Sequence, residues 1–165
     1  MTEPTIHPGA FVAPDARIHG DVHIADGAVV LFGVVMRAEF DQIRIGRETN
    51  VQDGVIVHCD AGVPTSIGER VTVGHAVVIH GSTIGNDCLV GIGSRTLNQS
   101  VLGEGAWLGA GAVLTEGTEI PPWTLALGIP ARPVRELTPD EVVRQRRGVE
   151  NYQTIAALYR ERFTS

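Results

Sequence analysis

The sequence is poor in aromatic residues and in cysteine. Phe, Trp and Tyr make up 5% of its 165 residues, and only two cysteines, Cys59 and Cys88, are present. Large aromatic rings therefore cannot fill the core, which must be built from smaller aliphatic side chains. Two cysteines allow at most one disulfide, and in a reducing compartment we expect both to be free thiols.

Basic residues and long apolar runs are also scarce. Thirteen Lys and Arg stand against nineteen Asp and Glu, which gives a formal net charge of -6. Such a chain lacks the clustered basic face that nucleic acid or an anionic membrane requires. No run approaches the roughly 20 apolar residues of a membrane helix, and the N-terminal segment MTEPTIHPGA has no signal-peptide pattern. We therefore expect a cytoplasmic protein that binds neither nucleic acid nor membrane.

What the sequence does contain is a repeat of six residues. An aliphatic residue or Thr returns at this spacing, often followed by Gly, with a few longer or shorter steps. The positions are Val12, Ile18, Ile24, Val30, Met36, Ile45, Val51, Val57, Ile67, Val73, Ile79, Ile84, Val90, Thr96, Leu102, Leu108, Leu114 and Ile120. A period of six fits neither a helical stripe nor simple strand alternation.

The repeat predicts short strands joined by tight corners. Three sides close one triangular coil, and successive coils stack by parallel strand pairing. The eighteen positions, at three to a coil, predict about six coils within residues 1–137. The pattern resembles the hexapeptide-repeat family, which implies a left-handed parallel β-helix. The left hand comes from this resemblance, since parallel crossovers usually prefer the right hand.

Residues 138–165 have a different pattern, which predicts a C-terminal α-helix. Thr138 to Glu141 form a capping box with Pro139 in the first turn. Apolar residues then recur at three- and four-residue intervals, at Val142, Val149, Tyr152, Ile155, Ala156, Tyr159 and Phe163. We expect this stripe to pack on the β-helix or on a neighbouring subunit, with an interruption of the helix at Gly148.

The repeat also places three of the six histidines. Arg37, His58 and His80 each follow a core position on the same side of successive coils, so His58 and His80 are expected one coil apart. His75 belongs to the preceding side, about 15 Å from His80 along an extended chain, whereas zinc ligands lie about 2 Å from the ion. Either His75 is a solvated side chain, or it completes a site on another subunit. The second alternative predicts a homotrimer with metal sites at its interfaces.

The segments VVMRAEFDQIRIGRETNVQDGVIVH, VTVGHAVVIHG and LVGIGS resemble the γ-class carbonic anhydrase family. The resemblance implies that His58, His75 and His80 bind Zn²⁺, with His75 supplied by the adjacent subunit. Fe²⁺ or Co²⁺ would suit the same ligands. It further implies an intersubunit ion pair of Arg37 with Glu39 at the site, and that Gln52 orients the bound water or bicarbonate.

The activity implied by this resemblance is the reversible hydration of carbon dioxide to bicarbonate by a metal-bound hydroxide. The sequence departs from the family pattern at Glu39, where Asp is usual, and at Asn98, where many relatives have an acidic residue. The loop from Cys59 to Ser66 carries only Asp60 as an acid, in place of a glutamate-bearing loop that moves protons. We therefore expect turnover to be slow.

Two other functions remain open at this point. The tail LGIPARPVREL resembles the loop that ends the β-helix of hexapeptide-repeat acyltransferases. An acyltransferase or thioesterase acting on coenzyme A esters would use one histidine as a base and no metal. The third alternative is a non-catalytic trimer that binds a metal. Three histidines at these positions of the repeat favour a metal-binding function over one that acts on coenzyme A esters.

Overall fold

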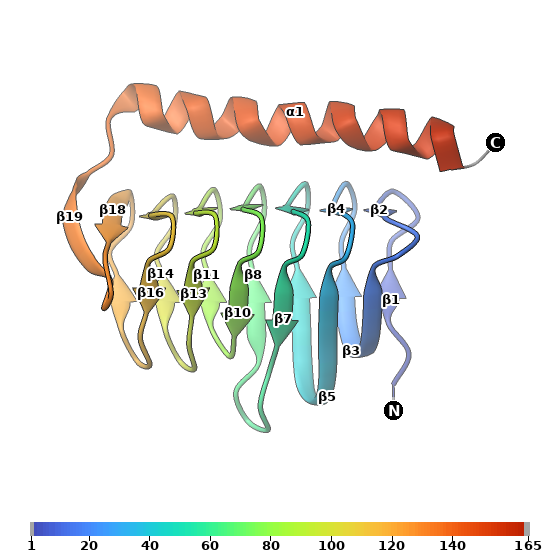
Figure 1. Ribbon diagram of the computed structural model, residues 1–165, viewed down its shortest axis with the longest axis horizontal. Coiled ribbons are helices and arrows are strands. Elements are labelled where there is room, and N and C mark those ends of the chain that lie inside the picture. The colour runs from blue at the N-terminus through green and yellow to red at the C-terminus, as the bar shows by residue number, and fades with distance from the viewer. Residues whose placement is uncertain (1, 164–165) are drawn as a thin grey trace.

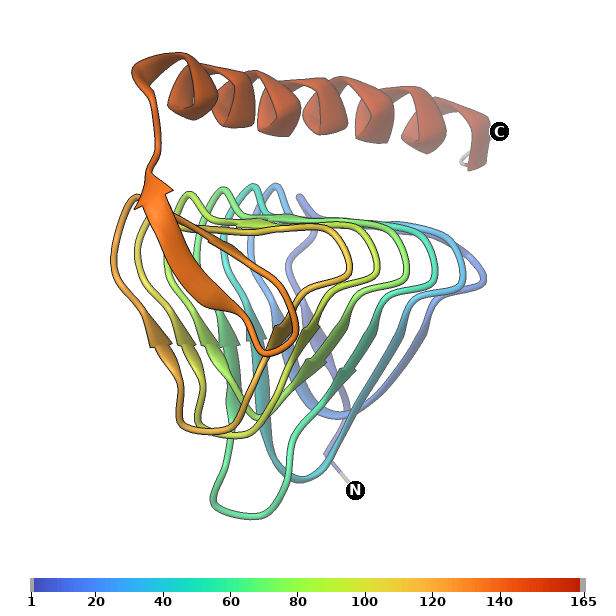
Figure 2. The same ribbon diagram turned by 60° about the vertical axis from the view of Figure 1, so that its left-hand side comes forward.

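The computed structural model describes residues 2–163, and residues 1, 164 and 165 lie outside the described part. It shows the predicted left-handed parallel β-helix followed by one helix (Figure 1). Seen obliquely along the stack, the coils are triangular (Figure 2). The helix α1 (Pro139–Phe163) lies along one side of the stack.

The strands form two sheets that wrap the three sides of the solenoid. The first sheet contains β2 (Phe11–Val12), β4 (Val29–Val30), β6 (Asn50–Val51), β9 (Thr72–Val73), β12 (Leu89–Val90), β15 (Trp107–Leu108), β18 (Thr124–Leu127) and β19 (Arg132–Glu136). The second contains β1 (Thr5–Ile6), β3 (Arg17–Ile24), β5 (Val35–Ile45), β7 (Ile56–His58), β8 (Thr65–Ile67), β10 (Val78–His80), β11 (Thr83–Ile84), β13 (Arg95–Thr96), β14 (Val101–Leu102), β16 (Val113–Leu114) and β17 (Glu119–Ile120). The second sheet covers two sides because β3 and β5 continue around a corner, β5 pairing with β7 and then with β8.

The stack has seven turns, one more than the sequence predicted. In the first sheet β2, β4, β6, β9, β12, β15 and β18 pair in parallel, one strand per turn, and only β19 is antiparallel. The extra turn carries Ala126, which is fully buried and lies six residues after Ile120. The aliphatic pattern missed this turn because Ala126 contributes a small side chain where earlier turns have Val, Ile or Leu.

The repeat positions fill the interior. All of them except Val12 and Ile18 are buried, and these two pack against the core at the N-terminal end of the stack. Gly46 shows why glycine follows so many core residues: a Cβ atom there would lie 2.3 Å from the carbonyl oxygen of Gly68 in the next turn. The corners therefore stack backbone on backbone, at a separation that a side chain would prevent.

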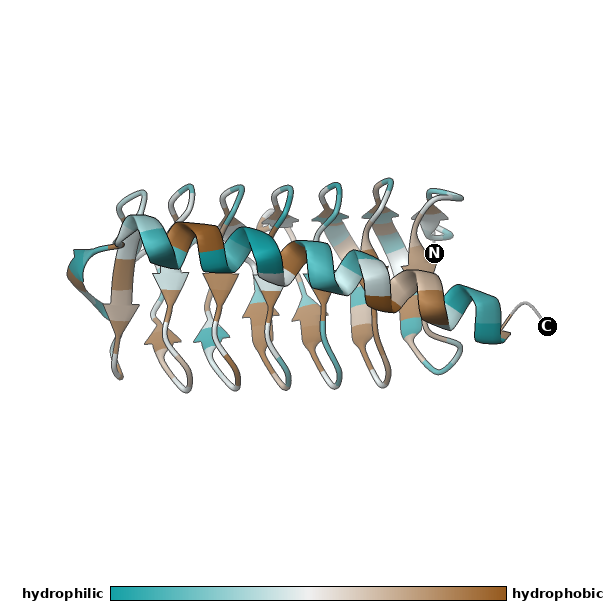
Figure 3. Ribbon diagram, turned by 90° about the horizontal axis from the view of Figure 1, so that it is seen from above, coloured by the Kyte–Doolittle hydropathy of each residue, from teal (hydrophilic) through white to brown (hydrophobic). Residues whose placement is uncertain are grey.

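The helix α1 packs on its own β-helix. Val149 and Ala156 are buried, and Tyr159 stacks on the ring of Phe11 with the ring centroids 5.8 Å apart. Seen from above, α1 crosses the whole stack (Figure 3). The predicted interruption at Gly148 is wrong, since α1 is continuous through it. One glycine costs only about 1 kcal/mol relative to alanine, which tertiary packing readily offsets.

Polar contacts fasten α1 to the backbone of separate turns. The amide of Gln145 donates to the carbonyl oxygen of Cys88, and that of Gln153 donates to the carbonyl oxygen of Gly27, both at 2.8 Å.

In the described part of the chain, no helix is long and apolar enough to cross a membrane.

The capping box is formed as the sequence predicted. The backbone N–H of Thr138 donates to the Glu141 carboxylate at 2.8 Å, and the backbone N–H of Glu141 donates to the Thr138 hydroxyl at 3.3 Å. Both terminal nitrogens of Arg135 also donate to Glu141 at 2.8 Å. The hydrogen bonds from Arg135, followed by that from the Thr138 backbone, lower the pKa of Glu141 to about 2.

We predict that Glu141→Gln lowers the melting temperature at pH 7 and that this difference disappears in strong acid. A carboxylate whose pKa is depressed by folding stabilises the folded state fully above its unfolded value of 4.5. That contribution declines below pH 4.5 and is lost as the pH falls through about 2. Thermal melts of both proteins between pH 7 and pH 2 measure it. A difference in melting temperature that stays constant with pH would contradict this assignment.

Candidate metal centre

Three consecutive turns place Arg37, His58 and His80 in one column. Arg37 pairs with His58 across β5 and β7, and His58 pairs with His80 across β7 and β10. The register predicted from the repeat is therefore confirmed. His19 lies opposite Arg37 one turn earlier. Arg37, His58 and His80 each follow a buried core residue, so the alternation of side chains along a strand turns them outward.

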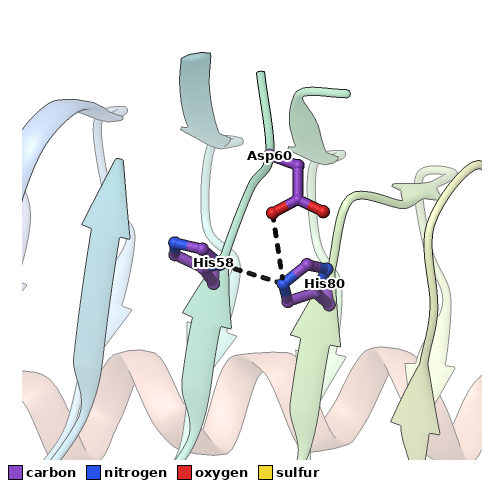
Figure 4. A group of neighbouring side chains, drawn as sticks. All are labelled: His58, Asp60 and His80. Carbon is purple, nitrogen blue, oxygen red and sulfur yellow. Dashed lines mark hydrogen bonds and ion pairs between the residues drawn. The ribbon is translucent and has the colours of Figure 1, made fainter. Parts of the chain in front are cut away.

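The two histidines of the column face each other closely. His58 Nδ1 lies 2.9 Å from His80 Nε2, and the ring centroids are 4.9 Å apart (Figure 4). The side chains are partly buried, with 17% of His58 and 30% of His80 exposed. Two imidazole nitrogens at this separation can become ligands of one ion with small ring movements.

Asp60 adds a carboxylate to the pair. Its Oδ1 lies 3.9 Å from His80 Nε2, and one ligand atom each of His58, Asp60 and His80 lie within 4.8 Å of one another (Figure 4). From the sequence, Asp60 was expected only as the acid of its loop. Its spacing of two residues from His58 was the available signal, because residues i and i+2 of an extended segment share a face.

The residues at this corner fit a divalent cation. His58 Nε2 and Glu39 Oε2 are buried without a hydrogen-bond partner among the described residues, and they lie 3.4 Å apart. Buried polar atoms are normally satisfied, and a cation bound at His58 Nδ1 would leave the ring proton on Nε2, where it faces Glu39. Imidazole and carboxylate donors suit zinc, iron and cobalt.

Glu39 is held in its ionised form at this corner. Burial by itself would raise the pKa of Glu39, but the hydrogen bond from Arg37, a backbone hydrogen bond and the charge of Arg37 together outweigh that effect. The net result is a pKa below the usual value, to which His58 contributes. Arg37 and Glu39 hydrogen-bond within the same chain, two residues apart on β5. Their predicted pairing across a subunit interface stays a prediction.

His75 lies on another corner of the solenoid, between β9 and β10. Its Nδ1 is 2.9 Å from Asp53 Oδ2, and 46% of its side chain is exposed. His75 does not belong to the group formed by His58, Asp60 and His80. This separation within one chain agrees with the length of extended chain between His75 and His80.

Gln52 lies next to Asp53 and is also apart from the His58 and His80 pair. It is buried, and its Nε2 donates to Asn50 Oδ1 at 3.0 Å. Gln52 borders an apolar groove of about 330 Å³ on the first sheet, which Trp107 also lines. Cys59 follows His58 but points into the core, where it is fully buried, so it is no ligand at this corner.

Comparison with known proteins places this geometry in a family. No family model matches the chain. The γ-carbonic anhydrase 2 of Arabidopsis thaliana mitochondria is 36% identical over 162 residues, which cover 94% of this chain and 58% of that protein. The chain thus spans about three fifths of this relative. A "probable carbonic anhydrase" of Methanocaldococcus jannaschii is 46% identical over 131 residues, covering 79% of this chain and 82% of that protein.

The carbonic anhydrase of Geobacillus kaustophilus is 40% identical over 163 residues, covering 96% of this chain and 90% of that protein. The chain belongs to the γ-carbonic anhydrase-like family. The carnitine operon protein CaiE of Escherichia coli is also similar, at 33% identity over 152 residues, covering 92% of this chain and 78% of that protein.

Solved structures show how widely the γ-carbonic anhydrase-like scaffold is shared. A proposed acetyltransferase of Bacillus cereus matches with a TM-score of 0.95 and 36% identity, covering 96% of this chain and 92% of that chain. A hexapeptide transferase family protein of Anaplasma phagocytophilum matches with a TM-score of 0.91 and 38% identity, covering 94% and 92%. Because proteins with transferase names share the scaffold, the side chains at the site must decide the chemistry.

Proposed function

We propose that this γ-carbonic anhydrase-like chain is a metal-dependent enzyme that hydrates carbon dioxide reversibly. The observation that carries the proposal is the pair of imidazoles of His58 and His80, 2.9 Å apart at a corner that also holds Asp60 and Glu39. The names of the Methanocaldococcus and Geobacillus relatives support the same activity.

The proposed assembly is a homotrimer with one metal site at each interface. His58 and His80 of one chain hold the ion, and His75 of the adjacent chain completes the ligand set. The separation of His75 from the other two histidines within one chain supports this division. A zinc ion bound there would act as a Lewis acid that ionises water near neutral pH, which is the chemistry that hydration requires.

The remaining residues would act around the substrate. Gln52 lies beside Asp53, whose carboxylate contacts His75, so it would approach the ion from the side of the adjacent chain and orient water or bicarbonate by a hydrogen bond. Glu39, kept ionised by Arg37, would hold the His58 ring from the outer side. Asp60 is the one acid of its loop and is half exposed, so its carboxylate would accept a proton and pass it to solvent.

A cytoplasmic location is part of the proposal. Cys59 and Cys88 are both free and buried, which fits a reducing compartment. The Arabidopsis relative is mitochondrial by name.

The second candidate function is transfer or hydrolysis of a coenzyme A ester. The transferase names of the Bacillus and Anaplasma structures favour it. Parallel assays on one preparation distinguish the two functions. Hydration of carbon dioxide above the buffer rate, with no release of free coenzyme A from acetyl-coenzyme A, is the result we expect. Thiol release without hydration would overturn the proposal in favour of the second candidate.

We predict about one bound divalent metal per chain in the purified protein, and its loss in His58→Ala. Removing one of the ligands leaves too few donors to hold the ion against solvent and buffer. Elemental analysis of the desalted protein measures the stoichiometry. His7→Ala is the control, since His7 lies near the N-terminus, is about half exposed and should keep the metal. Equal metal content in both variants would rule out His58 as a ligand.

A further inference from the structure

The side-chain amide of Asn98 lies between His80 and Asp60. Its Oδ1 is 2.6 Å from His80 Nδ1, and its Nδ2 donates to Asp60 Oδ2 at 2.8 Å. Asn98 belongs to the corner after β13, in the turn that follows β10. The proposed function gives Asn98 no role, although it contacts two of the three residues that converge at the metal centre.

The contact with Asp60 fixes which way the amide points. Asn98 Nδ2 donates to Asp60 Oδ2, so the NH₂ group of Asn98 faces Asp60. The carbonyl oxygen of Asn98 must then face His80. A carbonyl oxygen is only an acceptor, so the ring nitrogen that it meets, His80 Nδ1, must carry the proton.

A proton on Nδ1 of His80 determines the state of its other ring nitrogen, Nε2. In a neutral imidazole with a proton on Nδ1, the lone pair lies on Nε2. This is the atom that lies 2.9 Å from His58 Nδ1 and 3.9 Å from Asp60 Oδ1. The chain of contacts from Asp60 through Asn98 therefore presents the lone pair of His80 to the corner where the metal ligands converge.

The backbone leaves space for this arrangement at Gly81. A Cβ atom on Gly81 would lie 2.3 Å from Asn98 Oδ1, and Gly81 has a positive φ of 54°. Glycine adopts this conformation without strain, and its lack of a Cβ leaves room for the amide oxygen. Gly81, directly after His80, thus allows the Asn98 side chain to contact the His80 ring.

We propose that Asn98 is the positioning residue of His80: held by Asp60, it fixes the ring orientation and the tautomer in which Nε2 is free to bind a metal. The metal part of this inference rests on the proposed function, whereas the tautomer part does not. Groups that hold the outer nitrogen of a histidine ligand typically change metal affinity by about 10- to 100-fold when they are removed.

The tautomer is tested first, on the metal-free wild-type chain. Nitrogen-15 NMR of the histidine side chains at a pH where His80 is neutral, with His80→Gln to assign the signals, shows which ring nitrogen is protonated. We expect the proton on Nδ1 in the wild type and a shift of population toward Nε2 in Asn98→Ala. A wild-type His80 protonated on Nε2 would overturn the proposal without any variant of Asn98 having to fold.

Zinc affinity is tested next, by competition with a chromophoric chelator. Asn98→Ala should bind zinc about 10- to 100-fold more weakly than the wild type. The matched control is Asn86→Ala, because Asn86 also stands at a corner and accepts a hydrogen bond from the backbone N–H of Glu69, at 2.9 Å. Asn86→Ala should leave zinc affinity unchanged. Equal affinity of the wild type and Asn98→Ala would overturn the proposal.

A reversed pair of side chains gives a rescue experiment. Asn98→Asp alone sets two carboxylates against each other across the 2.8 Å contact and should weaken zinc binding. Adding Asp60→Asn restores a donor and an acceptor in the reverse order while an oxygen still faces His80. The double variant should bind zinc more tightly than Asn98→Asp, and the opposite order would count against the network.

These outcomes separate Asn98 from the activity of the site. A wild-type chain that binds zinc but hydrates no carbon dioxide would contradict the proposed function and leave the role of Asn98 to be decided by the zinc affinities. A chain that hydrates carbon dioxide equally well and binds zinc equally tightly with Asn98→Ala would contradict only the role of Asn98.

Discussion

Mixing His75→Ala chains with His80→Ala chains should restore carbon dioxide hydration that neither variant has alone. Each pure variant lacks one ligand at every site and should hydrate no faster than buffer. In a mixed trimer, an interface works when its first chain has intact His58 and His80 and its second chain has intact His75. In a random 1:1 mixture about one quarter of the interfaces meet this condition in a cyclic trimer.

The control mixture combines His58→Ala chains with His80→Ala chains. Both substitutions damage the same half of the site, so no interface regains a full ligand set and no activity should return. The mixtures are made by unfolding and refolding the variants together, and hydration is followed by stopped flow. Recovery in both mixtures, recovery in neither, or a pure His75→Ala protein with wild-type activity would contradict a site shared between chains.

Leu108→Ala should reduce the free energy of unfolding by about 2–5 kcal/mol. Leu108 is fully buried at a repeat position on β15, and its side chain packs against the turns before and after it. A solenoid gains its stability from contacts between neighbouring turns, so a cavity there weakens two interfaces at once. Chemical denaturation at equal protein concentrations measures the change, because oligomer stability depends on concentration.

The matched control is Leu158→Ala on α1. Leu158 has the same side chain but is 62% exposed, so its removal should change the free energy of unfolding by no more than about 0.5 kcal/mol. Equal losses in the two variants would mean that the interior of the solenoid is not the main source of stability.

The sequence was sufficient for the architecture because each turn repeats the same local rule. Core positions such as Met36, Val57 and Ile79 are buried as the spacing required, and they set the register that brings His58 to His80. The six-residue pattern missed the seventh turn, because Ala126 supplies only a small side chain to the core there. The expected interruption at Gly148 was wrong because tertiary contacts hold the helix in place.

The candidate site was only partly predictable. The column of His58 and His80 follows from the repeat. The position of His75 on a different side follows from the extended residues that separate it from His80. The contacts of Asn98 do not follow, because the ladder places Thr96 opposite Ile79, and hence Leu97 next to His80, and only the bend of the corner brings Asn98 to the ring. The six-residue repeat predicts where strand residues lie, but it does not predict the contacts of side chains at the corners.

The most direct test of the central claim is stopped-flow carbon dioxide hydration on samples with graded zinc occupancy. The account predicts a rate that rises in proportion to the zinc bound per chain, returns to the buffer rate after chelation, and is absent from His80→Ala at every zinc concentration. A wild-type protein that carries a full complement of zinc and hydrates carbon dioxide no faster than buffer would contradict it.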